Sequence, residues 1–235
     1  MAPVLIDFRN VDIVQEDNVI LNNVDLQVKA GEFVYFTGKV GTGKSSLLKS
    51  FYGELDISKG EAWVLHNNMI KIKRRHIPAL RRKLGIVFQD FQLLNDRSVF
   101  GNLDFVLRAT GCRSKRERKK RICQVLAQVG LEDKGEQMPY RLSGGEQQCV
   151  CIARAILNNP QIILADEATG NLDKESARKA ASILYNISKG GTAVILSTHN
   201  EELIPEFPGT VYYFADKSLD ECTNKIVELQ SNHLY

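Results

Sequence analysis

The strongest structural signal in the chain is Leu142-Ser143-Gly144-Gly145-Glu146-Gln147-Gln148, which follows an earlier glycine-rich run, Gly38-Lys39-Val40-Gly41-Thr42-Gly43-Lys44-Ser45. The earlier run fits the pattern GxxxxGK[ST] of a phosphate-binding loop, in which glycines let backbone N–H groups turn towards phosphate oxygens. An apolar run at 33–36 precedes the loop, and residues 45–51 after it have a helical pattern. Strand, glycine loop and helix is the context that this motif requires.

Strand and helix patterns alternate along most of the chain, which predicts an α/β fold with a largely parallel sheet. A mostly helical stretch interrupts the alternation. We therefore predict a single domain, 1–235, with a nucleotide-binding core at 1–89 and 151–235 and a helical subdomain at about 90–150. Strands are expected at 4–8, 24–28, 33–36, 84–88, 162–165 and 193–197, and helices at 45–51, within 98–140, at 142–157 and at 174–188.

Composition is that of an ordinary globular protein, with 43% hydrophobic and 25% charged residues. No apolar stretch reaches the length of about 18 residues needed to span a bilayer, and the N-terminus has no signal-peptide pattern. The five cysteines lack zinc-site spacing. Cys149 and Cys151, two apart on an expected helix, make a poor ligand pair. We expect free thiols in a reducing cytoplasm.

The net charge of +3 hides an asymmetry. Residues 71–83 hold seven Lys or Arg and no acid, and residues 113–121 hold seven more with one Glu. Such stretches can bind anionic lipid or nucleic acid, or can simply be solvated. Because neither stretch contains aromatic residues for base stacking, no nucleic-acid partner is expected.

Polar side chains follow the expected strands at one edge of the sheet, where open parallel sheets bind ligands. Asp166 and Glu167 follow strand 162–165, His199 follows strand 193–197, and Gln89 follows strand 84–88. One carboxylate there can hold magnesium and its neighbour can polarise an attacking water. The candidate catalytic residues are Glu167, His199 and Gln89, and the candidate metal ligands are Ser45, Gln89 and Asp166.

Two runs are predicted to bind phosphate. In the first, Lys44 would reach the β- and γ-phosphates and the Ser45 hydroxyl would coordinate magnesium. In the second, Ser143 and backbone amides at a helix start make another anion site. The candidate nucleotide-binding residues are Gly38, Lys39, Val40, Gly41, Thr42, Gly43, Lys44, Ser45, Ser46, Ser143, Gly144, Gly145 and Asp173.

The phosphate loop, Gln89, 142–148, 162–167 and His199, in this order, resemble the ATPase subunits of the ABC transporter family. The resemblance implies the ABC ATPase core, with antiparallel N-terminal strands and a helical signature subdomain, and it implies ATP and Mg²⁺ as ligands. Glu167 would then be the general base, and His199 would contact the γ-phosphate. Gly170-Asn171-Leu172-Asp173 looks like the family's D-loop. The resemblance further implies a head-to-tail homodimer with ATP between the phosphate loop of one subunit and the signature of the other.

The segment 88–99, with Asp96-Arg97-Ser98-Val99 and then Asn102, looks like the cell-division branch of the family, the FtsE-type ATPases. That likeness implies an FtsX-like integral membrane partner, an indirect link to peptidoglycan hydrolases, and a peripheral position at the inner, cytoplasmic face of the plasma membrane. Apolar residues around 91–100 would form the partner's groove or belong to the core of the helical subdomain.

Three alternatives stay open. The first is a lipoprotein-release or macrolide-export ATPase, which the chain resembles in layout. The second is a soluble ABC protein acting on DNA or ribosomes, and the third is a cassette that binds nucleotide without hydrolysing it. The family's adenine-stacking aromatic near position 15 is absent, since this chain has Val14-Gln15-Glu16. Cys149, Ala168 and the pair Lys39-Val40 also depart from the usual pattern.

Overall fold

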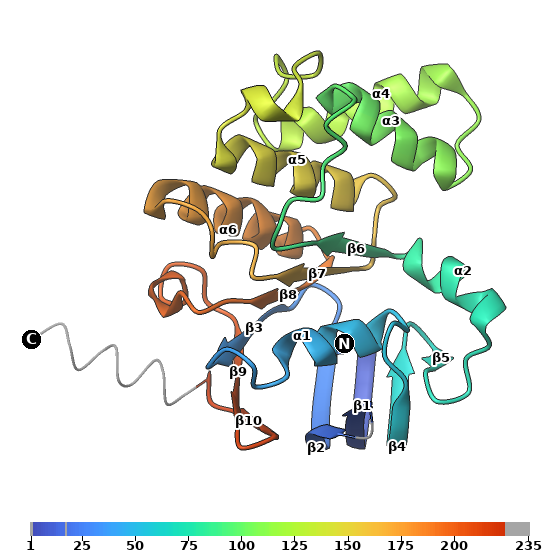
Figure 1. Ribbon diagram of the computed structural model, residues 1–235, viewed down its shortest axis with the longest axis vertical. Helices are drawn as coiled ribbons and strands as arrows, with labels where there is room; N and C mark the ends of the chain where they lie inside the picture. Colours follow the sequence, from blue (N-terminus) through green and yellow to red (C-terminus); the bar gives the residue numbers. More distant parts are fainter. Residues whose placement is uncertain (1, 17, 224–235) are drawn as a thin grey trace, which may run out of the picture.

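A computed structural model describes residues 2–16 and 18–223 of the chain. The strands form two sheets (Figure 1). One is antiparallel, with the order β2-β1-β4-β5, and the other has six strands in the order β10-β9-β3-β8-β7-β6. All neighbours in the larger sheet are parallel except β10 and β9. The predicted α/β architecture, with antiparallel strands at the N-terminus, is confirmed.

The strands of the antiparallel sheet are β1 (Val4–Gln15), β2 (Asn18–Lys29), β4 (Ile57–Val64) and β5 (Asn67–Asn68). Those of the larger sheet are β3 (Phe33–Gly38), β6 (Leu84–Val87), β7 (Ile162–Asp166), β8 (Ala193–Ser197), β9 (Thr210–Ala215) and β10 (Ser218–Glu221). The α-helices are α1 (Lys44–Phe51), α2 (Ile77–Arg81), α3 (Val99–Ala109), α4 (Lys115–Gln128), α5 (Gly144–Ile156) and α6 (Lys174–Lys189), and short 3₁₀ turns lie at Arg74–His76, Pro139–Arg141 and Glu201–Leu203.

The expected helical stretch 98–140 consists of two helices with irregular chain after them. Each begins at a serine, because the Ser98 hydroxyl accepts the N–H of Gly101 and the Ser114 hydroxyl accepts that of Glu117. The second helix ends before Gly130, whose φ of +69° lies in the left-handed region that favours glycine. The periodicity of 98–140 thus indicated helices correctly but did not show where each one ends.

The larger sheet has a hydrophobic layer on each face, and β3 illustrates the division. Phe33 and Tyr35 belong to the cluster with helices α3 to α6, whereas Val34 and Phe36 belong to the cluster with α1 and the antiparallel sheet. Figure 1 shows α5 and α6 on one side of the large sheet and α1 on the other. Burial on both faces explains why β3, β7 and β8 are continuous apolar runs in the sequence.

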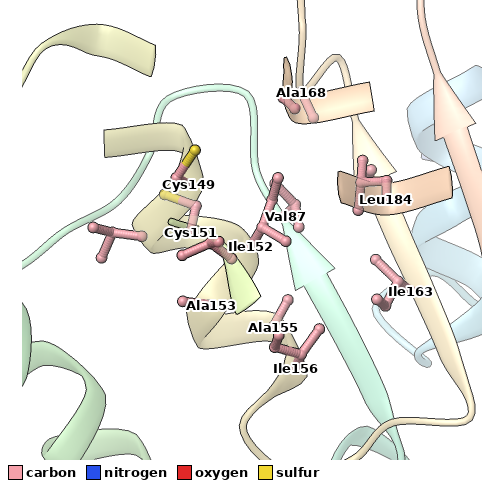
Figure 2. Packing of buried hydrophobic residues seen from close by; sticks show 14 of the residues in the cluster. Val87, Cys149, Cys151, Ile152, Ala153, Ala155, Ile156, Ile163, Ala168 and Leu184 are labelled. Carbon is pink, nitrogen blue, oxygen red and sulfur yellow. The ribbon is translucent and has the colours of Figure 1, made fainter. Parts of the chain in front are cut away.

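Helix α5 crosses the expected boundary between 150 and 151 without interruption. Its buried side chains gather beside Val87 of β6 (Figure 2). At the far end, a Cβ placed on Gly85 would lie 2.6 Å from the carbonyl oxygen of Ala155, so helix and strand approach closely there. One continuous core therefore connects the helical stretch to the sheet. None of the helices in the described part of the chain has the length and apolarity needed to cross a membrane.

Candidate functional site

Strands β3, β8, β7 and β6 are neighbours in the large sheet, so their carboxyl ends meet at one edge. The phosphate loop follows β3, Asp166 ends β7, His199 follows β8, and Gln89 follows β6. This is the edge at which open parallel sheets bind ligands. The structure thus brings together the candidate residues that the sequence placed at strand ends.

The phosphate loop turns through three glycines in the left-handed region, with φ of +124° at Gly38, +81° at Gly41 and +103° at Gly43. The Lys44 ammonium, 4% exposed, donates to the carbonyl oxygens of Gly38 and Lys39, each at 2.9 Å. No side chain caps α1, because its N-cap is Gly43. A helix N-terminus without a cap, beside a buried cation, can receive phosphate oxygens.

The two carboxylates have different partners. The Ser45 hydroxyl donates to Oδ1 of Asp166 at 3.0 Å, whereas Nε2 of His199 lies 2.9 Å from Oε1 of Glu167. The backbone of Glu167 has φ of +48°, and its N–H donates to the carbonyl oxygen of Ser197 at 3.0 Å. A non-glycine residue in this region is strained, and such strain concentrates at functional sites. With this left-handed backbone at Glu167, the adjacent side chains of Asp166 and Glu167 contact different partners.

Burial changes the pKa values of two charged groups at this edge, Asp166 and Lys44. It raises the pKa of Asp166, and the hydrogen bond from Ser45 partly opposes that rise. Burial likewise lowers the pKa of Lys44, and the negative charges of Glu167 and Asp166 partly oppose that change. Lys44 and Asp166 therefore support each other's charged forms in a partly dehydrated site.

The donor set fits magnesium bound together with a nucleotide. Within residues 2–16 and 18–223, no three His, Cys, Asp or Glu side chains form a metal cluster. A buried carboxylate bonded to a hydroxyl is an oxygen pair suited to Mg²⁺, which usually takes one or two protein ligands and completes its shell with phosphates and water. Ser45 and Asp166 are in contact, whereas Gln89 is exposed. In the described residues the hydrogen bond of Gln89 to this region is made by its backbone carbonyl oxygen, which accepts from Nδ2 of Asn171 at 3.5 Å.

The sequence reasoning missed a buried hydroxyl pair beneath the two candidate catalytic side chains. Oγ1 of Thr169 and Oγ1 of Thr198 lie 3.0 Å apart, and Thr198 also accepts the N–H of Asn200 at 3.0 Å. The pair joins the loop after Glu167 to the strand end before His199. Threonines directly beside two candidate residues were the available signal, but only the fold shows that they meet.

The signature run begins α5 with a capping box. The Ser143 hydroxyl accepts the N–H of Glu146 at 3.2 Å, and the Glu146 carboxylate accepts the N–H of Ser143 at 2.8 Å. Lys134 lies 3.0 Å from the same carboxylate. The Ser143 N–H and Lys134 together hold the pKa of Glu146 below its ordinary value. This helix start is complete within the chain itself.

The candidate D-loop packs beside the signature. Asp173 is the N-cap of α6, where it accepts the N–H of Ser176 at 2.9 Å. A Cβ on Gly145 would lie 2.4 Å from the Ser176 hydroxyl, so glycine is required by this packing. In the described part of the chain, no hydrogen bond joins 143–145 to the phosphate loop. The two candidate anion sites are therefore separate in one copy.

The comparisons agree with this geometry. Residues 21–170 match the family model described as ABC transporter. The cell division ATP-binding protein FtsE of Streptococcus pneumoniae serotype 2 is 41% identical over 202 residues, covering 85% of this chain and 87% of that protein. FtsE of Escherichia coli K12 is 40% identical over 184 residues, covering 78% of this chain and 82% of that protein.

Among solved structures, a dimeric bacterial ABC transporter cassette, MJ0796, superposes with a TM-score of 0.81 at 32% identity, covering 92% of this chain and 97% of that one. A second structure of MJ0796 is a dimer in a post-hydrolysis state bound to ADP and Pi, with a TM-score of 0.81 at 31% identity, covering 92% of this chain and 98% of that one. On the family match, the FtsE relatives and this fold, the chain belongs to the ABC transporter family as one of its ATP-hydrolysing cassettes.

Proposed function

We propose that this cassette is the ATPase subunit of an FtsEX-like membrane complex, which transmits an ATP-driven conformational change to peptidoglycan hydrolases during cell division. The observation that carries the proposal is the similarity to FtsE proteins of several bacteria, 39–44% identical over 78–85% of this chain. The cassette would sit at the cytoplasmic face of the plasma membrane, bound to an FtsX-like integral protein.

The proposed roles at the site follow from its contacts. Lys44 and the loop amides bind the β- and γ-phosphates, and Ser45, Asp166 and Gln89 hold Mg²⁺, which supplies positive charge against the phosphate oxygens. Glu167 accepts a proton from the water that attacks the γ-phosphorus, so that ATP and water give ADP and phosphate. His199, already 2.9 Å from Glu167, orients that carboxylate and donates towards the γ-phosphate.

The proposed active form is a homodimer on ATP. Ser143, Gly144 and Gly145 lie at a helix start whose capping box is complete within the chain, and in the described residues no hydrogen bond joins them to the chain's own phosphate loop. A two-fold pair of copies places each signature against the other's nucleotide. The MJ0796 cassette is dimeric in both structures, which supports a dimer for this similar chain.

The loop that precedes α3 supports a protein partner near Gln89. Asn102, 3% exposed, holds this loop by accepting the N–H of Leu94 at 2.8 Å and donating to the carbonyl oxygens of Leu94 and Ser98, each at 3.0 Å. The Arg97 guanidinium lies 4.7 Å from the ring centroid of Phe105, which is 46% exposed. A rigid loop that presents apolar and cationic side chains suits a docking surface for the membrane partner.

The test is purification of the tagged chain from native membranes with and without ATP, as wild type and as Glu167→Gln. If Glu167 is the general base, the variant accumulates an ATP-bound dimer and retains the partner more strongly, and Glu201→Gln, an exposed carboxylate outside the site, behaves like wild type. Recovery of a four-span membrane protein with one extracellular loop domain supports the proposal. A partner with a large periplasmic domain assigns the chain to export or lipoprotein release instead.

A further inference from the structure

The two basic stretches lack the ion pairs that other basic side chains of the protein make. All seven Lys and Arg of 71–83 are exposed, and none lies within ion-pair distance of a carboxylate in the described structure. In 113–121 only Arg118 makes an ion pair, with Asp104 at 2.6 Å. Elsewhere, Lys49, Lys59, Lys134, Lys174 and Arg178 each lie within 4.0 Å of a carboxylate.

The positive charges of helix α4 are placed where they destabilise the helix. Lys115, Arg116, Lys119 and Lys120 are exposed in its first two turns, next to the positive end of the helix dipole. The pairs Lys115–Lys119 and Arg116–Lys120 place like charges four residues apart, which destabilises a helix. These like-charge pairs add no stability to a helix that only faces solvent. A helix that binds anions would be stabilised by the bound negative charge.

The two stretches lie on the same side of the molecule. In Figure 1, α2 and the beginning of α4 both lie towards the right of the view, and β6 starts between them. A groove of about 440 Å³ runs from the first stretch towards the second, since Arg81 and Arg82 line it together with Ala109 and Thr110 at the end of α3. The groove lining contains Arg154 as well and no Asp or Glu. The groove therefore extends the basic surface of 71–83 to the end of α3, shortly before α4 begins at Lys115.

Two of the arginines that line the groove donate hydrogen bonds to backbone carbonyl oxygens. Nε of Arg81 donates to the carbonyl oxygen of Tyr52 at 2.9 Å, and Arg154 donates to the carbonyl oxygen of Phe91 at 2.8 Å. Carbonyl oxygens orient a guanidinium but carry no net charge to neutralise it. These cations are therefore held in place and remain available to an external anion.

We infer that residues 71–83 and 113–121 form one basic face that binds anionic phospholipid headgroups of the bilayer. Several clustered Lys and Arg side chains suit an anionic membrane surface, where each contributes a factor of about five in binding. Neither stretch contains Phe, Tyr or Trp to stack on a base. The choice of lipid over nucleic acid also rests on the proposed function, which places the chain at a membrane.

The experiment measures co-flotation of the full chain with vesicles of phosphatidylcholine alone or with 30% phosphatidylglycerol, roughly the composition range used to test surface charge. One variant carries K71Q, K73Q, R74Q and R75Q, and a second carries K115Q, R116Q, K119Q and K120Q. A charge-matched control carries K174Q, K179Q, K189Q and K217Q, which are exposed positions outside the two stretches. Circular dichroism and ATPase activity in solution check that every variant is folded.

We expect binding only to the anionic vesicles, weakening as salt is raised, because exposed charges are screened. Each basic-face variant should bind at least about tenfold more weakly, and the control should bind within about threefold of wild type. Equal binding to neutral vesicles, or equal losses in the control, would overturn the inference. Stronger capture by duplex DNA at the same ionic strength, lost in the same variants, would make this a nucleic-acid face. No partner protein is needed, so these outcomes leave the proposed function to its own test.

Discussion

Helices α1 and α5 both begin at a predicted phosphate site, but the two N-termini are built differently. Helix α1 starts after Gly43 with no side-chain cap and no acidic residue in its first turn. Helix α5 starts at Ser143 with a complete capping box, and Glu146 lies in its first turn. The first terminus keeps its backbone donors for a ligand, whereas the second is stabilised by its own side chains. The comparison indicates that α5 is ready before nucleotide arrives, while α1 is completed by it.

The largest effect should come from the uncapped terminus. Replacing Lys44 by Ala removes the buried cation of the phosphate loop, so we expect ATP hydrolysis to fall by about 100-fold or more. Steady-state release of phosphate measures this loss. Lys49→Ala, which removes an exposed ion pair of the same helix, should leave the rate within about twofold. An active Lys44→Ala protein would mean that this loop does not hold the reacting phosphates.

The second largest effect should come from disturbing the contact between Gly145, at the start of α5, and Ser176 of α6. Gly145→Ala forces a methyl group against the Ser176 side chain and should lower the free energy of unfolding by about 1–3 kcal/mol. Gly144→Ala is the matched control, because its nearest neighbour, Cδ2 of Leu172, would be 3.8 Å away. Urea denaturation compares the two. Adding Ser176→Gly to Gly145→Ala should restore part of the loss, and no restoration would place the strain elsewhere.

The cap itself should have a smaller effect. Ser143→Ala removes the acceptor for the Glu146 N–H and should cost about 1 kcal/mol of folding stability. Ser98→Ala removes the equivalent cap of α3 and should cost a similar amount. If the signature acts on a second copy's nucleotide, only Ser143→Ala should also slow ATP hydrolysis. Equal rates of ATP hydrolysis in the two variants would mean that Ser143 only caps its helix and has no role at the nucleotide.

The smallest effect concerns pH. If Asp166 holds magnesium as proposed, it must be a carboxylate, and because burial raises its pKa the ATPase rate should begin to fall at a pH above the ordinary Asp value. Ser45→Ala removes the hydrogen bond that lowers this pKa, so the decline should begin at a still higher pH. For folding the sign is opposite, because the fold favours the protonated form. The contribution of Asp166 to stability therefore decreases as pH rises from its ordinary pKa to the raised one. Rate–pH profiles of both proteins, with excess magnesium, test the shift.

The parts of the fold that the sequence predicted are those with local signals. The phosphate loop has a fixed glycine spacing, and β7 and β8 are buried on both faces, so their apolar runs are continuous. Strand β4 was missed because Ser58-Lys59-Gly60-Glu61 interrupts its apolar pattern, although pairing with β1 stabilises it. The β1–β2 hairpin is longer than expected for the same reason, since its pairing is set by the partner strand.

In the candidate site too, features with a local sequence signal were predicted and features that depend on distant contacts were not. Strand ends placed Asp166 and His199 at one edge, because parallel strands end together. The left-handed backbone of Glu167 and the Thr169–Thr198 pair depend on contacts between distant segments, which residue patterns along the chain do not encode. The capping box of Ser143 was within reach of the sequence, since a glutamate follows three residues later, but its Lys134 partner was not.

The continuity of α5 has a mechanical consequence. Thirteen residues make a stiff rod of about 20 Å, with the signature at one end and the close contact with Gly85 near the other. If a second copy contacts the Ser143 end, as proposed above, a displacement there would be carried along one unbroken helix to the close contact between Gly85 and Ala155. Arg154 belongs to the same helix and donates hydrogen bonds to the backbone carbonyl oxygens of Phe91 and Gln92. We therefore expect a displacement of the signature to reach the segment after Gln89 through α5 and Arg154.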